Sequence, residues 1–256
     1  MNKSKDTQKK RIVFLNDRFL PLSQARISVL DRGFLFGDGV YEVLPIYDGE
    51  LLALLMHVVR LQKNLRAIYC DAVLNHAWIK RVILRLLRLN HAAKGSYSLY
   101  LQVTRGVDND RNRKLTRGLK PTVFMMLRPI SPLVYEELRI GKAAVTARDI
   151  RWECCYIKSI SLLPTLLLQH QASRNNAEEV IIIRYGQVLE GGSSNVYIVR
   201  KGKIFIPPLS KHNLSGVTRN LIMQLARQHR LAIVEKDIAE RSLLTADEIW
   251  ISSSTR

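Results

Sequence analysis

The sequence has few cysteines, and their placement excludes two common kinds of stabilising site. Three occur among 256 residues, at Cys70, Cys154 and Cys155. An odd number with two adjacent residues forms no disulfide framework and no Cys-x-x-Cys metal motif, and the six histidines lack the spacing of metal ligands. We therefore expect no metal site and a reducing, cytoplasmic environment.

Long apolar runs are also absent. No stretch approaches the roughly 20 apolar residues that cross a bilayer as a helix. The start of the chain, MNKSKDTQKKR, is polar and basic and has no apolar segment after it, unlike a secretory signal. We expect residues 1–10 to form a basic tail, and we expect no membrane partner.

Acidic residues are scarce relative to basic ones. Lys and Arg total 40 against 22 Asp and Glu, a formal net charge of +18. The basic residues are scattered among core-type residues, as in IKRVILRLLRLNHAAK, and no helix-turn-helix, zinc-finger or RNA-recognition signature is present. This pattern is typical of a solvated basic surface that favours anionic small molecules, so no nucleic-acid partner is expected.

Short strands and amphipathic helices are mixed along the chain and predict two lobes. An α+β lobe with two hairpins and two helices is expected over 11–128. Two prolines within PISPL, 129–133, predict the connection between the lobes. The rest of the chain, 134–256, is predicted to form a C-terminal lobe with helices over about 162–175 and 217–229.

One lysine stands at the edge of a strongly apolar stretch. In YIKSISLLPTLLLQHQ, residues 156–171, Lys158 is the single formal charge when His170 is neutral. Lysines buried without a partner tend to lose their proton and then act as nucleophiles that bond to carbonyl groups. A lysine at a strand end can instead extend its tip into water. The stretch alone leaves both interpretations open.

Four further segments have residue types suited to a bound ligand. DRGFLFGDGVYEV is dense in glycine, LSGVTRN begins a helix at a glycine and suits a phosphate, ISSST is a hydroxyl cluster, and VLEGGSSNVYIV places Glu190 beside small residues. Each has a structural alternative: a tight turn, a helix cap or a polar strand end. Together with Lys158, however, they supply the amine, carboxylate and phosphate site that pyridoxal phosphate requires. Nucleotide cofactors are disfavoured because Gly-x-Gly-x-x-Gly and Walker motifs are missing.

The order of these motifs resembles that of a known enzyme family. DRGFLFGDGVYEV, HVVRL, LQVTRG, IRWECCYIKSISLL, EGGSSNVY, LSGVTRN and DEIWISSST occur in the order and rough spacing of the class IV aminotransferases, and most closely of their D-amino-acid transaminases. The resemblance begins near residue 11 and covers nearly the whole remaining chain. It implies the two-lobed α+β fold of fold type IV, with a small N-terminal lobe, a larger barrel-like C-terminal lobe that contains the reactive lysine, and pyridoxal 5′-phosphate between them.

The resemblance also implies roles for individual residues. Lys158 matches the lysine that forms the Schiff base and shuttles the proton, and Glu190 matches the partner of the pyridine nitrogen. The matched phosphate ligands are Arg60, Val217, Thr218 and Thr255. Other residues matched to the cofactor's surroundings are Leu214 on one ring face, Arg151 nearby, and Ser193 and Ser194 in the loop beside the ring. Tyr41 matches a contact to the substrate carboxylate.

The chain departs from the family pattern in two places. After VTRG, the D-amino-acid enzymes have an Arg-x-His pair that binds the substrate carboxylate across a dimer interface. Here Arg111 and Arg113 lie near that place without a histidine, and an ungapped alignment puts Asp110 at the arginine position. The chain also ends a few tens of residues before the family's usual end, so we expect a final strand and helix to be missing and the lone Thr255 contact to be weakened.

These observations predict a homodimeric transaminase that moves an amino group from an amino acid, D-alanine or another D-amino acid, to a 2-oxo acid. The alternatives are aminodeoxychorismate lyase, a branched-chain or R-amine transaminase, and an inactive truncated relic that still binds the cofactor.

Overall fold

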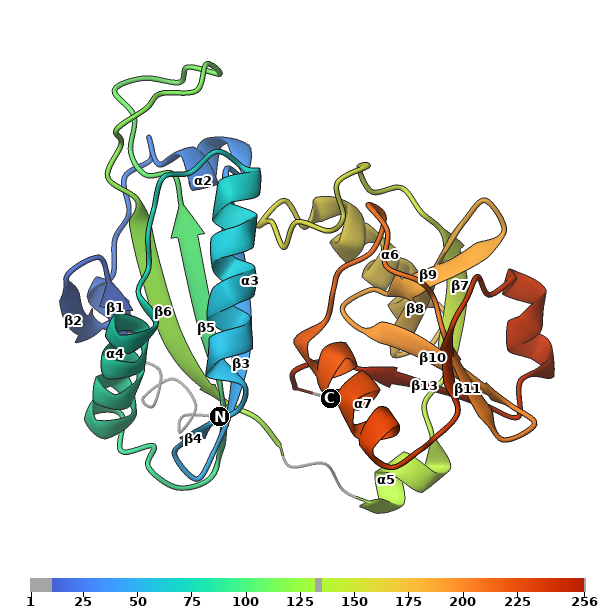
Figure 1. Ribbon diagram of the computed structural model, residues 1–256. Coiled ribbons are helices and arrows are strands. Elements are labelled where there is room, and N and C mark those ends of the chain that lie inside the picture. Colours follow the sequence, from blue (N-terminus) through green and yellow to red (C-terminus); the bar gives the residue numbers. More distant parts are fainter. Residues whose placement is uncertain (1–10, 132–134, 256) are drawn as a thin grey trace. The chain divides into compact units, whose positions relative to one another are not determined.

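The computed structural model describes residues 11–131 and 135–255 (Figure 1). The expected basic tail, 1–10, and part of the expected connection, 129–133, lie outside these residues. Contacts divide the described chain into two compact units. Unit 1 contains residues 11–131 together with Lys158–Ser161 and Thr255, and unit 2 contains the remaining described residues.

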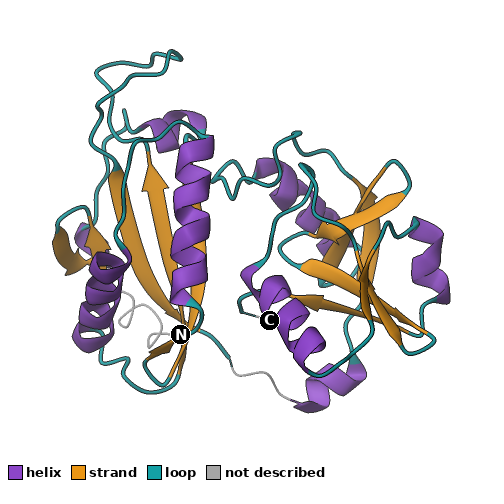
Figure 2. Cartoon of the chain, viewed as in Figure 1, coloured by secondary structure: helices purple, strands orange, loops and turns teal. Residues whose placement is uncertain are grey.

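Unit 1 is built on a 6-stranded sheet of strand order β2-β1-β6-β5-β3-β4. Figure 2 shows strands in orange and helices in purple. Neighbouring strands all pair antiparallel. The strands are β1 (Ile12–Leu15), β2 (Arg18–Pro21), β3 (Gly39–Tyr47), β4 (Glu50–Leu51), β5 (Ser96–Thr104) and β6 (Thr122–Pro129). Asp48 and Gly49, both with positive φ, make the tight turn between β3 and β4, because this turn needs residues that tolerate left-handed backbone.

Two helices of 14 residues each cover this sheet, α3 (Leu54–Ala67) and α4 (His76–Leu89). In α4 the apolar side chains recur with helical periodicity and are buried, whereas Lys80, Arg81 and Arg85 are exposed. The side chain of Asn75 caps its first turn by accepting from the amides of Ala77 and Trp78. A short helix, α2 (Arg32–Phe36), and a 3-10 turn, η1 (Leu22–Gln24), complete the unit.

Unit 2 contains two sheets. The smaller has the order β7-β8-β9, and the larger has the order β12-β11-β10-β13. Their strands are β7 (Ala144–Arg148), β8 (Glu179–Arg184), β9 (Gln187–Gly191), β10 (Asn195–Arg200), β11 (Lys203–Ile206), β12 (Ile233–Glu235) and β13 (Glu248–Ser252). The helices are α5 (Tyr135–Ile140), α6 (Leu163–Arg174), α7 (Val217–Gln228) and the 3-10 helix η2 (Glu240–Thr245).

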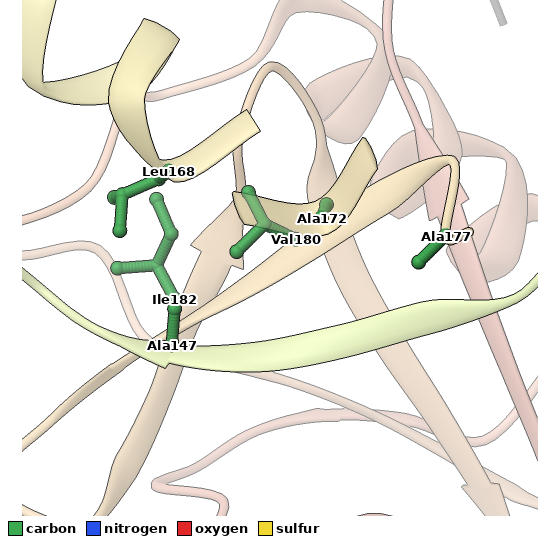
Figure 3. Close-up of a cluster of buried hydrophobic side chains, with 6 residues drawn as sticks. All are labelled: Ala147, Leu168, Ala172, Ala177, Val180 and Ile182. Atoms are coloured by element: carbon green, nitrogen blue, oxygen red, sulfur yellow. The ribbon is translucent and has the colours of Figure 1, made fainter. Parts of the chain in front are cut away.

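Several apolar clusters hold unit 2 together, and two of them meet at β8. Helix α6 packs on β7 and β8 through Leu168 and Ala172, which contact Ala147, Val180 and Ile182 (Figure 3). The alternate residues of β8, Ile181 and Ile183, belong to a second cluster. Its other buried members are Val188 on β9, Val196 and Ile198 on β10, and Ile238. Because side chains alternate along a strand, β8 is buried on both of its faces and serves both clusters.

The segment Lys158–Ser161 differs from its expected place. By chain order Lys158 falls in the C-terminal lobe, but its contacts are with unit 1. The segment extends along the free edge of β3, where the backbone amides of Tyr41 and Ile160 complete hydrogen bonds to Lys158 and Gly39. Edge strands leave unpaired backbone groups, and this pairing satisfies them. Within the described ranges, no helix has the length and apolar character needed to span a bilayer.

Candidate functional site

Lys158 lies against an aromatic side chain of unit 1. Its backbone carbonyl accepts a hydrogen bond of 3.0 Å from the amide of Tyr41, and Ser159 forms an antiparallel bridge with Val40. The half-buried Lys158 ammonium then lies 4.3 Å from the centroid of the Tyr41 ring. This is cation–π geometry, so the backbone register and the ring together fix where the amine points.

Tyr41 belongs to a row of aromatic rings on the sheet. Its ring lies 5.7 Å from that of Tyr100 on β5, which in turn lies 6.4 Å from Phe124 on β6. Burial, with a smaller contribution from Tyr41, raises the pKa of Tyr100 to about 12, and its hydroxyl donates to Gln102 at 2.7 Å. Tyr100 therefore stays neutral at ordinary pH. The sequence motifs do not indicate Tyr100, which lies diagonally across the strand pair from Tyr41, opposite Val43.

Arg60 is held by a carboxylate within unit 1. Its Nε and Nη2 donate to the two oxygens of Glu42, each at 2.7 Å. His57 Nδ1 lies 2.8 Å from Glu42 Oε2. Burial would raise the pKa of Glu42, but hydrogen bonds and charge from Arg60, with a smaller contribution from His57, outweigh it and lower that pKa to about 2. Neither Glu42 nor His57 was predicted, because nothing in the sequence pairs residues 15 positions apart.

The glycine-rich segment is organised by buried ion pairs. Asp38 accepts from Arg32 Nε at 2.9 Å and from both Nε and Nη2 of Arg105, at 2.7 and 2.9 Å. Asp31 caps α2 by accepting from Gly33 N at 2.8 Å, and Gly37 ends that helix with a φ of 67°. This segment has a structural role: it fixes the chain before β3, as the tight-turn interpretation requires.

The loop after β5 contains Arg111 and Arg113, both exposed. The Arg111 guanidinium lies 5.4 Å from the Phe36 ring centroid. The loop is anchored by Arg32, whose Nη1 donates to Asn112 O at 2.6 Å and to Asp108 Oδ2 at 3.2 Å. The buried arginine thus ties the loop to α2, which sequence analysis did not predict.

In unit 2, Glu190 is the centre of a second charge cluster. Its Oε1 accepts from Arg151 Nη1 at 2.5 Å and its Oε2 from the amide of Leu214 at 2.9 Å. Arg151 also pairs through Nε with Asp149, at 3.0 Å, and the Asp149 side chain is fully buried. Burial opposes ionisation of Asp149 and Arg151, but their mutual hydrogen bonds prevail, so the pKa of Asp149 is lowered and that of Arg151 raised. Three predicted residues, Glu190, Arg151 and Leu214, are therefore brought together.

The start of α7 has the features of an anion site. Its N-cap is Gly216, so no side chain caps the first turn, which starts at Val217. A Cβ on Gly216 would collide with Asn195 Oδ1, so any larger residue would force the Asn195 side chain or the backbone to shift. Thr218 donates through Oγ1 to Ser253 O at 3.0 Å, which joins α7 to the end of β13. Exposed amides and the dipole at such a helix start suit a phosphate.

The other predicted residues have mixed surroundings. Ser194 is buried and donates to Glu179 Oε2 at 2.9 Å, whereas Ser193 is exposed. Thr255 is half-buried and belongs to unit 1. In the hydroxyl cluster of β13, Ser252 forms a 2.9 Å hydrogen bond with the hydroxyl of Tyr197. Part of each serine-rich segment thus stabilises unit 2 itself.

Each unit by itself contains groups of the types that bind pyridoxal phosphate. Unit 1 supplies an amine at Lys158 and a guanidinium at Arg60, and unit 2 supplies a buried carboxylate at Glu190 and the helix start at Val217 and Thr218. These are the groups that a carbonyl, a pyridine nitrogen and a phosphate would bind. Among the residues that the structure describes, no cluster of three or more His, Cys, Asp and Glu could hold a metal.

Residues 39–256 match the family model described as Amino-transferase class IV. The chain is 39% identical over 243 residues to a D-alanine aminotransferase of Bacillus licheniformis, which covers 95% of this chain and 84% of that protein. It is 35% identical over 243 residues to one of Staphylococcus epidermidis, covering 95% and 85%. Among solved structures it resembles in fold a branched-chain aminotransferase of Thermoproteus uzoniensis with norvaline, at a TM-score of 0.85, 23% identity and coverage of 95% and 84%. It also resembles in fold the PLP-bound form of a hypothetical aminotransferase of Mycobacterium tuberculosis. The TM-score is 0.81 and the sequence identity 23%, and the match covers 95% of this chain and 87% of that chain.

Proposed function

Because this chain belongs to the class IV aminotransferases, we propose that it transfers the amino group of D-alanine, or of a closely related D-amino acid, to a 2-oxo acid with the help of pyridoxal phosphate. The single observation that favours D-alanine is its 39% identity with a D-alanine aminotransferase across 95% of the chain.

Lys158 would hold the cofactor covalently and move a proton during the reaction. When bound, pyridoxal phosphate supplies a carbonyl that reacts with amines and a pyridine ring that withdraws electrons. The contact with Tyr41 directs the Lys158 amine, and a lysine so oriented can give and take a proton without a large rearrangement. Catalysis by positioned acid–base groups is typically worth about 10²–10⁴ in rate.

Glu190 would accept a hydrogen bond from the ring nitrogen and so keep that nitrogen protonated. Its burial strengthens the electrostatic effect, since low dielectric surroundings reduce screening. The phosphate would be bound by Arg60, the amides at Val217 and Thr218, and Thr255. Leu214, Arg151, Ser193 and Ser194 would line the cofactor, in keeping with the resemblance of their segments to the family motifs.

The substrate carboxylate would be bound by Tyr41 and by cations of the loop after β5. Arg111 and Arg113 are exposed there, and the Arg32 anchor limits how far the loop can move. Either guanidinium suits a carboxylate, which it can bind through two parallel hydrogen bonds.

We further infer a homodimer in the cytoplasm. Helix α6 exposes Leu163, Leu166 and Leu167 at i, i+3 and i+4, so these leucines share one face of the helix. Unit 1 exposes Val29 at 69% and Phe34 at 66%. An exposed apolar helix face such as that of α6 is typical of a surface that another subunit covers. The free thiols of Cys70, Cys154 and Cys155 support a reducing compartment.

The test is a substrate panel on the purified chain supplied with pyridoxal phosphate. D-alanine with 2-oxoglutarate should yield pyruvate, detected with lactate dehydrogenase, and glutamate of D configuration. L-alanine should give little, and Lys158→Ala should give none while remaining folded by circular dichroism.

Two outcomes would replace the proposal. Pyruvate released from aminodeoxychorismate, but not from D-alanine, would identify a lyase. Turnover of L-leucine in preference to D-alanine would identify a branched-chain specificity.

A further inference from the structure

Glu42, His57 and Arg60 form a buried polar cluster where α3 lies along β3 (Figure 1). We propose that Glu42, supported by His57, is a positioning residue that presents the Arg60 guanidinium to a phosphate monoester, the phosphate of the cofactor. The inference rests on the proposed function, in which Arg60 binds that phosphate.

The geometry of the pair fixes the plane of the guanidinium. Arg60 uses Nε and Nη2 for the two oxygens of Glu42, both at 2.7 Å. Two parallel hydrogen bonds fix the orientation of the guanidinium relative to the carboxylate. With a single hydrogen bond, the guanidinium could still pivot about that contact. A guanidinium has five N–H groups, so its three others face away from Glu42. The carboxylate therefore selects one orientation from the many that a long side chain can adopt.

Because the pair is buried, it is energetically costly for Arg60 to leave this orientation. The side chains of Glu42 and Arg60 are 3% and 12% exposed. If Arg60 swung away, it would leave an ionised carboxylate buried without its cation, which is costly. The arginine is thus held in place before any ligand arrives, and binding does not have to order its side chain.

His57 restrains the carboxylate in turn. With a pKa of about 2, Glu42 is ionised at neutral pH and can only accept hydrogen bonds. The hydrogen between the two residues must therefore be on His57 Nδ1, which lies 2.8 Å from Oε2. His57 is on α3 one turn before Arg60, so a single helix supplies both contacts to Glu42.

The experiment measures what the phosphate group adds to binding. The full-length protein, freed of cofactor, is titrated with pyridoxal and with pyridoxal phosphate. The dissociation constant for pyridoxal is divided by that for pyridoxal phosphate, and this ratio is compared among variants. Both ligands have the same ring and carbonyl, so the ratio isolates the phosphate. Glu42→Gln should reduce this ratio by about tenfold or more, since it weakens a charge-assisted contact.

Asp38→Asn is the matched control. It removes a different carboxylate of unit 1, the half-buried Asp38, which pairs with Arg32 and Arg105 outside the proposed phosphate site. Both variants should melt at lower temperature, but only Glu42→Gln should change the ratio. In an Arg60→Ala background, Glu42→Gln should have no further effect on the ratio, because the two residues act through the same contact.

A second pair of variants decides the matter if Glu42→Gln does not fold. His57→Asn keeps an N–H donor near the Nδ1 position, and His57→Leu removes it. We expect His57→Leu to lower the ratio about threefold and His57→Asn to restore most of the loss. A ratio that stays at the wild-type value in Glu42→Gln, or in His57→Leu, would show that the cluster only stabilises the fold.

Failure of this inference is distinguishable from failure of the proposed function. If Arg60→Ala leaves the ratio unchanged, Arg60 does not bind the phosphate and the inference is overturned. Covalent attachment at Lys158, trapped with borohydride and located by mass spectrometry, reports separately on whether the cofactor is bound at all.

Discussion

At the scale of single residues, the functional groups are held by neighbours of opposite charge. Arg151 is shared between Glu190 and the fully buried Asp149. Arg60 is held in the same manner by Glu42. In both clusters a residue that we propose to bind the cofactor is paired with a second residue that orients it.

The Glu190 cluster leads to a prediction about rate. Glu190→Gln should lower kcat by about 10²–10⁴ and change cofactor affinity much less, because a neutral amide no longer stabilises a protonated ring nitrogen. Stopped-flow mixing with D-alanine measures the rate, and titration measures the affinity.

The control for this prediction is Glu153→Gln. Glu153 pairs with Arg184 in the same network, but its side chain is 57% exposed. Its loss should leave the rate within about twofold, since exposed ion pairs contribute little. A Glu190→Gln variant as fast as the wild type would mean that the ring nitrogen has another partner.

At the scale of elements, α7 depends on the close approach of two backbone segments. Asn195, at the start of β10, donates through Nδ2 to Leu214 O at 3.2 Å, just before the helix begins. Its Oδ1 occupies the space that a Cβ on Gly216 would need. The backbone dihedrals of Gly216, φ −68° and ψ 137°, are accessible to any residue. Packing rather than backbone strain therefore demands glycine at this position.

We expect Gly216→Ala to displace the start of α7. The collision should lower the free energy of unfolding by about 1–3 kcal/mol, as overpacking usually does. It should also weaken the binding of pyridoxal phosphate more than that of pyridoxal, because the displaced amides are proposed to bind the phosphate. Thermal melting and the two titrations test both effects.

Asn195→Ala provides the matched background for this substitution. With the amide oxygen of Asn195 gone, Gly216→Ala should lower the free energy of unfolding much less than it does in the wild type. Equal costs in the two backgrounds would show that the collision with Asn195 is not the cause.

At the scale of the whole molecule, helix α6 exposes an apolar face of leucines, which is unfavourable for a protein that stays monomeric in water. Leu163, Leu166 and Leu167 are 67%, 62% and 54% exposed, whereas Leu168 on the same helix is buried in the unit 2 core (Figure 3). An apolar face in this position is typical of a subunit interface.

Leu166→Glu should therefore weaken the homodimer. Placing a charge within a buried apolar interface usually costs at least 2 kcal/mol, or about 30-fold in the dissociation constant. Sedimentation velocity at a series of concentrations measures this shift. Leu244→Glu is the control, since Leu244 is 91% exposed on η2 and its substitution should leave the dimer intact. A wild-type chain that sediments as a monomer at all concentrations would contradict the inferred dimer.

The sequence by itself determined the family, the cofactor class and the local structure. Helix α6 spans Leu163–Arg174 where 162–175 was expected, and α7 spans Val217–Gln228 where 217–229 was expected. Such elements follow from the periodicity of neighbouring residues, which the sequence displays directly. The prediction that Lys158 is the reactive lysine also rests on local features, namely a lone charge in an apolar stretch and the family motif around it.

Only the tertiary structure decided which residues meet. It joined Glu42 to Arg60 and His57, Asp149 to Arg151, and the Lys158–Ser161 segment to the edge of β3 in unit 1. None of these contacts has a sequence signature, because ion pairs and strand pairing between distant segments depend on how helices and sheets pack. Gly191 and Gly192 illustrate the same limit. They lie against Glu179 and Ser194, so their small size is already required by packing within unit 2. Spacing along the chain predicts what an element is, whereas burial and charge pairing between elements determine what surrounds it.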